Sequence, residues 1–160
     1  MIIRIDLRVD LDAERWGEEA GTDPADAARD ACWYLSDARD CIPHIGEDGC
    51  PAHLKMIPGW EEDQDLFGAV KIRSLWQVHC SAADWIAWRE NPGPTADGFT
   101  VPPGQARQDL ARTVVEGLVW MSLFADAQAV MTLVHPWQQT YDHTRKARPK
   151  WRPSARGRTG

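Results

Sequence analysis

The sequence predicts an α+β fold, in which a small, mainly antiparallel sheet is packed by three or four helices. Two stretches, residues 2–11 and 67–80, alternate apolar and polar side chains with the period of a half-buried strand. Apolar residues at helical spacing, or in one long run, mark three further stretches: residues 24–39, 82–90 and 103–134. Two strands alone leave the strand order open. We also expect a metal ion to tie down the loop at residues 40–54.

The first strand opens the chain with a clean alternation. Arg and Asp alternate on one side, and the apolar side carries Ile3, Ile5, Leu7, Val9 and Leu11. Because successive side chains of a strand point to opposite faces, this strand should have one buried face and one wet face. Opposite charges on the wet face suit cross-strand pairing. A short turn or helix at residues 12–19 then carries Trp16.

This opening resembles the start of small uncharacterised proteins encoded by phages of actinobacteria. The likeness lies in the alternating strand that ends Val9-Asp10-Leu11-Asp12, in Trp16 four residues later, and in Glu-Glu-Ala-Gly before a helix. It covers the first 40 residues and leaves out the ligand-rich stretch described below. The resemblance implies a small phage factor that regulates or targets a host protein, and it transfers no activity.

The first long helix is expected at residues 24–39. Asp23 can cap its N-terminus, and Pro24 fits the first turn, where no backbone N–H is needed. One apolar stripe follows at helical spacing: Ala28, Ala31, Cys32, Leu35 and Ala38. Cys32 on this stripe is interpreted as a small buried hydrophobe.

The most specific pattern in the chain is a repeated Cys-x2-His unit. Cys41 and His44 form the first unit, five residues intervene, and Cys50 and His53 form the second. Thiolate and imidazole are the usual Zn²⁺ ligands, and four of them close a tetrahedral structural site. We therefore expect structural Zn²⁺ in a knuckle-like loop at residues 40–54.

Two alternatives to this zinc site remain open. In the first, Cys32, His79 or Cys80 replaces one of the four ligands; in the second, the stretch binds no metal and forms an ordinary coil. A loop as long as residues 40–66 is uncommon without something that holds it, which favours the metal. The acidic run at residues 61–65 within this loop is interpreted as a solvated turn.

The second strand, residues 67–80, places Val70, Ile72, Trp76 and Val78 on one face. His79 and Cys80 should then point to opposite sides, so they cannot act as a nucleophile and its base. Ser81 is an N-cap for a helix at residues 82–90. The sequence Asn-Pro-Gly-Pro ends that helix.

The last predicted helix, residues 103–134, is apolar nearly all round from Val114 onward. At about 1.5 Å per residue it would be roughly 46 Å long, which is close to the width of a whole domain. Two outcomes fit that length. Either the helix breaks, near Gly117 or Ser122, or it extends into a partner or a second copy of the chain.

Charge is distributed unevenly along the chain. All 24 acidic residues and 11 of the 18 basic ones lie in residues 1–142, so this part carries −13, whereas residues 143–160 carry +7. We expect a single domain at residues 1–142 and a basic, disordered tail after it. An acidic body disfavours nucleic acid, but the tail could contact phosphates and stack a base. Its candidate residues are Arg145, Lys146, Arg148, Lys150, Trp151, Arg152, Arg156 and Arg158.

Function is less sharply indicated than fold. No signal peptide or membrane span is expected, since charges interrupt every apolar run, and four Cys suit a cytoplasmic protein with free thiols or metal ligands. No P-loop, HExxH or GxSxG motif occurs. We expect a non-enzymatic, zinc-stabilised, protein-binding factor. The alternatives are nucleic-acid binding through the tail and a zinc-dependent hydrolase.

Overall fold

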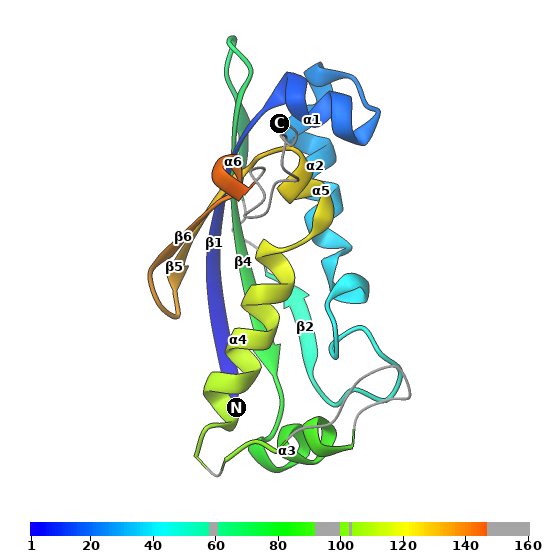
Figure 1. The fold of residues 1–160 in the computed structure, drawn as a ribbon, viewed down its shortest axis with the longest axis vertical. Coiled ribbons are helices and arrows are strands. Elements are labelled where there is room, and N and C mark those ends of the chain that lie inside the picture. The colour runs from blue at the N-terminus through cyan, green and yellow to red at the C-terminus, as the bar shows by residue number, and fades with distance from the viewer. Residues whose placement is uncertain (58–60, 92–99, 103, 147–160) are drawn as a thin grey trace, which may run out of the picture.

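A computed structural model describes residues 1–57, 61–91, 100–102 and 104–146 (Figure 1). The strands are β1 (Ile2–Asp12), β2 (His53–Met56), β3 (Glu61–Gln64), β4 (Ala69–His79), β5 (Val130–His135) and β6 (Gln139–Asp142). The helices are α1 (Ala13–Ala20), α2 (Ala27–Ser36), α3 (Ala82–Glu90), α4 (Ala106–Val119), α5 (Ser122–Asp126) and α6 (His143–Lys146). Two short 3₁₀ helices, η1 (Pro24–Asp26) and η2 (Ala38–Cys41), flank α2.

The sheet is built around β1 and β4, which pair antiparallel over eleven residues from Ile2↔His79 to Asp12↔Ala69. The order along the sheet is β2-β4-β1-β5-β6. β3 also pairs with β4, so β2 and β3 follow one another along the same edge of that strand. Every pairing in the described residues is antiparallel. The predicted α+β class with a mainly antiparallel sheet is therefore confirmed.

One face of the sheet is covered by helices α1, α2, α4 and α5, as Figure 1 shows. The two alternating patterns place their apolar side chains on this face, where Leu7 and Val78 are fully buried. Trp16, Trp76, Trp85 and Phe124 are the largest side chains of the core. A two-layer arrangement of this kind buries one face of an antiparallel sheet and leaves the other in water.

The open face carries the charged halves of the two patterns. Lys71 contacts Asp10 at 3.0 Å, and Arg73 contacts Asp6 at 3.1 Å, so the expected cross-strand pairing is present.

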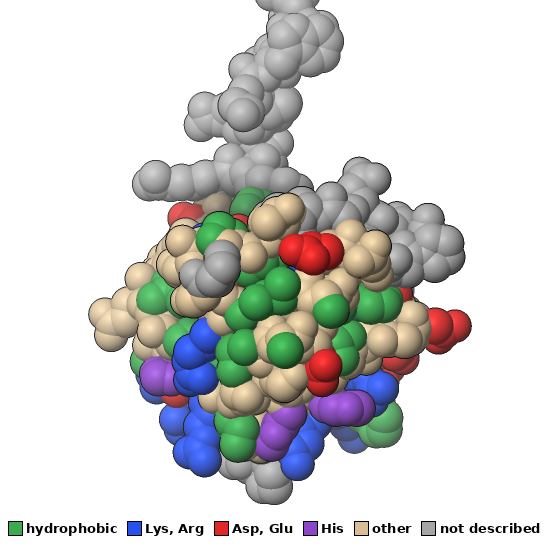
Figure 2. All heavy atoms as spheres, turned by 90° about the horizontal axis from the view of Figure 1, so that it is seen from below, with side chains coloured by type: hydrophobic (Ala, Val, Ile, Leu, Met, Phe, Trp, Pro, Cys, Tyr) green, Lys and Arg blue, Asp and Glu red, His purple; other side chains and the backbone are tan. Residues whose placement is uncertain are grey.

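Figure 2 views the end of the molecule that carries α3, and there Lys, Arg and His side chains gather along the lower rim of the picture.

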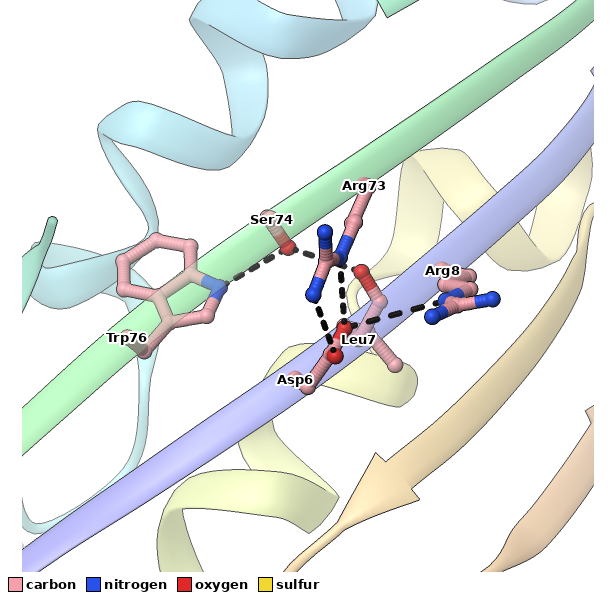
Figure 3. Close-up of polar contacts among 6 residues, drawn as sticks. All are labelled: Asp6, Leu7, Arg8, Arg73, Ser74 and Trp76. Atoms are coloured by element: carbon pink, nitrogen blue, oxygen red, sulfur yellow. Dashed lines mark hydrogen bonds and ion pairs between the residues drawn. The ribbon is translucent and has the colours of Figure 1, made fainter. Parts of the chain in front are cut away.

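A short polar chain crosses the centre of the buried face (Figure 3). The Trp76 indole N–H donates to Ser74 Oγ at 3.0 Å, and the Ser74 hydroxyl donates to the Leu7 carbonyl at 3.2 Å. Ser74 has no exposed surface, so its hydroxyl satisfies an indole that would otherwise have no partner in the core.

The expected long helix at residues 103–134 was wrong as a single element. α4 ends at Val119, α5 is a short helix after Trp120 and Met121, and residues 130–135 form β5. The break lies at the predicted region near Ser122. The strand was missed because a short apolar run is compatible with either a buried helix or a strand. Leu110, Val114 and Leu118 of α4 are buried, so the apolar side of the helix faces the core, and self-association through this segment stays a prediction.

The loop predicted at residues 40–66 contains two strands, β2 and β3. β3 forms from the acidic run, so the interpretation of that run as a solvated turn was wrong, although Asp and Glu have low strand propensity. Its position on the sheet edge explains the difference. Glu61 is opposite Arg73 and Asp63 is opposite Lys71, so charge complementarity offsets the poor propensity.

Prediction: Ser74→Ala destabilises the protein by about 1–3 kcal/mol, since it leaves the Trp76 N–H buried without an acceptor. In a Trp76→Phe background the same substitution should cost less, because that donor has already been removed. Urea unfolding of the two single variants and the double variant measures the difference. Equal costs in both backgrounds would contradict the role assigned to this chain of hydrogen bonds.

Candidate functional site

The stretch from Ile42 to Ala52 is held by the protein core. Ile42 is 1 % exposed and Ile45 is 4 % exposed, and both belong to the main apolar cluster. Ile42 packs against α4 at Gly117, where an added Cβ would lie 2.4 Å from Ile42 Cγ2. Burial of these two side chains supplies the anchor that the sequence interpretation assigned to a metal ion.

The four expected zinc ligands are placed on different surfaces. Cys41 is exposed at the end of η2, His44 faces α3, Cys50 is half-buried, and His53 lies on the open face of the sheet. The described residues contain no group of three or more His, Cys, Asp or Glu side chains placed to hold a metal. The donor set therefore does not fit a closed site, and the metal-tied loop is not seen. Zinc binding by these four residues stays a prediction that would require the loop to rearrange.

The remaining cysteines lie in the core. Burial raises the pKa of the Cys32 thiol to about 12, with a further contribution from Glu62, and raises that of Cys80 to about 11. A thiol of such high pKa is a poor nucleophile and a poor metal ligand at neutral pH. The interpretation of Cys32 as a buried hydrophobe agrees with its 4 % exposure.

His44 ends a polar chain that links three elements. Asp109 Oδ2 of α4 accepts from the Trp85 indole at 2.7 Å and from Arg89 Nε at 2.9 Å, both on α3. Arg89 Nη1 lies 3.0 Å from His44 Nε2. Since a guanidinium only donates, Nε2 is the acceptor and the ring proton is on Nδ1. The Trp88 indole also donates to the His44 carbonyl, at 3.2 Å.

The electrostatic setting keeps this imidazole neutral. Burial lowers the pKa of His44 from its ordinary value of 6.5, and the charge of Arg89 lowers it further, against smaller opposing effects of Glu47 and Asp109. Its backbone φ is 70°, a left-handed conformation that residues other than glycine adopt only occasionally. The contacts to α3 hold this strained turn in place.

Cys41 and His44 line the same cavity, of about 530 Å³, between η2 and the α4–α5 junction. Its wall also includes Tyr34, Arg89 and Trp120. The volume is that of a small-molecule pocket. No hydrogen bond joins Cys41 to His44 in the described part of the chain, so the two do not form a nucleophile–base pair there.

A second candidate site lies at the opposite end of the molecule, on the turn between β3 and β4. We call residues Asp65–Gly68 the β3–β4 tip. Leu66 is 99 % exposed and Phe67 is 93 % exposed, the highest values among the large apolar side chains of the described residues. Most soluble domains keep such side chains at least partly covered.

The β3–β4 tip is built as a rigid turn. Asp65 Oδ1 accepts from the backbone N–H of Phe67 at 2.8 Å and from that of Ala69 at 2.9 Å. Gly68 adopts φ 89°, which glycine allows, and its carbonyl accepts from Ala13 N at 2.8 Å. The turn is thereby fixed to the start of α1, and Leu66 and Phe67 are displayed rather than free to fold back.

This site was not predicted from the sequence, although the sequence contains a signal for the turn. Aspartate at the first position and glycine at the fourth position of a turn are common where two strands reverse. The polar chain of His44 carried no comparable signal, because Arg89 and Asp109 lie 20 residues apart and meet only when α3 packs against α4.

The candidate nucleic-acid residues of the tail are only partly described. Arg145 and Lys146 belong to α6, and Arg148, Lys150, Trp151, Arg152, Arg156 and Arg158 lie outside the described residues. The folded body continues past the expected boundary at residue 142. His143 is 1 % exposed, and its Nε2 lies 2.7 Å from the Val119 carbonyl.

Comparison with known proteins finds no matching family model, no matching curated protein and no matching solved structure. In the described part of the chain, none of the helices has the length and apolar character needed to span a membrane. The phage resemblance therefore stays a prediction.

Prediction: Ile42→Ala lowers stability by about 2–5 kcal/mol, because it opens a cavity between the loop and α4. In protein prepared without added zinc, a metal chelator should leave the melting temperature of the natural chain unchanged, since apolar contacts hold the loop. Both effects are read by thermal and urea unfolding. A large fall in melting temperature with chelator alone would instead support the closed zinc site.

Prediction: the stabilising effect of neutral His44 is lost on acidification. The folded-state pKa lies below that of the unfolded chain, so the unfolded chain binds a proton first as pH falls through 6.5. The stability advantage over His44→Asn, a residue that tolerates positive φ, should shrink between about pH 7.5 and about pH 5. Thermal unfolding across this range measures it. The control is His135→Asn, at an exposed histidine, and an advantage independent of pH would contradict the assignment.

Proposed function

We propose that the protein is a non-enzymatic binding factor that docks on another protein through the β3–β4 tip. The observation that carries this proposal is the near-complete exposure of Leu66 and Phe67 in a turn held by Asp65. Exposed apolar anchors of this kind are characteristic of interaction sites. Because the turn is already rigid, little conformational entropy is lost when it binds.

Charge around the tip indicates the kind of partner. Asp65 lies within the tip, and Glu61, Glu62 and Asp63 precede it on β3. Lys71 and Arg73, which lie opposite these carboxylates on β4, also form ion pairs with Asp10 and Asp6 on β1, so they neutralise the acidic group only in part. An apolar tip flanked by carboxylates is complementary to an apolar pocket rimmed by Lys and Arg. The same carboxylates disfavour an anionic membrane surface or a nucleic acid.

Binding through the tail to nucleic acid is kept as an alternative, supported by the seven basic residues of residues 143–160. It involves a different segment of the chain, so the two functions can be separated by substitution.

Prediction: Leu66→Ser/Phe67→Ser abolishes capture of the partner from a nuclease-treated lysate, with a stability change within about 0.5 kcal/mol because both side chains are exposed. Asp65→Ala should weaken capture, since the anchors remain but the turn is freed. Trp33→Gln, which removes an exposed aromatic ring from α2, is the matched control and should retain capture.

Quantitative mass spectrometry of the retained proteins, at increasing salt, provides the measurement. Salt should weaken capture by the natural chain if basic groups rim the partner pocket. An identical set of retained proteins for the natural chain and the double serine variant would refute docking through the tip. Loss of capture on nuclease treatment alone would favour the alternative.

A further inference from the structure

The end of the sheet opposite the β3–β4 tip brings two histidines together. In the β2–β4 pairing, His53 is directly opposite His79. The neighbouring Leu54 and Val78 are buried, whereas His53 is exposed and His79 is half-buried. Both imidazoles therefore project from the open face of the sheet.

We propose that His53 and His79 form a binding site for a late first-row divalent cation such as Zn²⁺. Directly opposite residues of an antiparallel pair have Cβ atoms about 4.5–5.5 Å apart, which lets two side chains reach one ion. Imidazole nitrogen is a preferred ligand of zinc, copper and nickel. Within the described residues no hydrogen bond engages either ring, so their nitrogen lone pairs are available.

The chemistry of the surroundings defines the class of site. Two protein ligands leave the other coordination positions to water or to a group from another molecule. Lys55 follows on the same face, opposite Gln77, and its charge limits affinity for the ion. Cys80 points into the protein, with 7 % exposure, and does not join the set.

An ion bound at this site would stabilise the pairing of β2 with β4. β2 has four residues, and β4 is its sole partner strand in the described sheet. Few backbone hydrogen bonds therefore hold β2 in the sheet. An ion that links His53 to His79 closes the end of this ladder, directly after the stretch from Ile42 to Ala52. Ligand binding to the folded state alone then raises stability by mass action.

This site differs from the zinc site expected from the sequence, which we call the loop set: Cys41, His44, Cys50 and His53. Substitutions can distinguish the two sites. His53 belongs to both sets, His79 belongs only to the pair, and Cys41 belongs only to the loop set. His135, exposed at the end of β5, belongs to neither and provides a matched histidine control.

The experiment is calorimetric titration of the full chain with ZnCl₂ in chelator-free buffer. His53→Gln and His79→Gln should each weaken binding by at least about tenfold, the loss that even an outer-shell change causes at metal sites. Cys41→Ser and His135→Gln should leave the affinity unchanged. The rise in melting temperature with zinc should disappear in His79→Gln and persist in His135→Gln.

Three results would overturn the proposal. One is the absence of zinc binding by the natural chain at about 1 mM, the weak end of specific affinity. Another is loss of binding in Cys41→Ser with retention in His79→Gln, which assigns the metal to the loop set. The third is equal affinity in His79→Gln and His135→Gln.

Discussion

The eleven-residue pairing of β1 with β4 is the constraint on which the rest of the structure depends. It pairs residues 2–12 with residues 69–79, the two ends of the first half of the chain. In this register the apolar side chains of both strands lie on the same face of the sheet. If one strand shifted its pairing register by one residue, all of its buried apolar side chains would move to the face in water. The charge pairs of Asp6 with Arg73 and Asp10 with Lys71 match the same register on the open face.

Everything else attaches to this pair of strands. β2 and β3 occupy successive parts of the outer edge of β4, and β5 pairs along β1. The buried face then sets the place of the helices, and α4 in turn holds the loop after η2 through Ile42. A glycine at position 117 permits that approach because any side chain would collide with Ile42. The polar chain from Trp85 through Asp109 and Arg89 to His44 orients the loop.

The two proposals use opposite ends of β4. At one end, a rigid acidic turn displays Leu66 and Phe67. At the other end, His79 meets His53 across the ladder. β1 pairs with β4 along its whole length, and the Ser74 hydrogen bonds lie between the two ends. A docking surface and a metal site can therefore occupy a single sheet independently, one driven by apolar burial and the other by ligand chemistry.

Local pattern in the sequence determined the elements whose signals lie within a few residues. β1 and β4 follow from alternation, and α3 follows from the Ser81 cap and the proline-rich stop, with the same bounds as predicted. Tertiary structure decided the rest. β3 forms because Arg73 and Lys71 face its carboxylates, β5 is a strand because β1 offers an unpaired edge, and His44 faces Arg89 because α3 packs on α4. The Cys-x2-His spacing could not foresee that Ile42 and Ile45 anchor the loop, since burial depends on distant residues. The physical reason is the same in each case: spacing reports which side chains share a face, but only packing reports what that face meets.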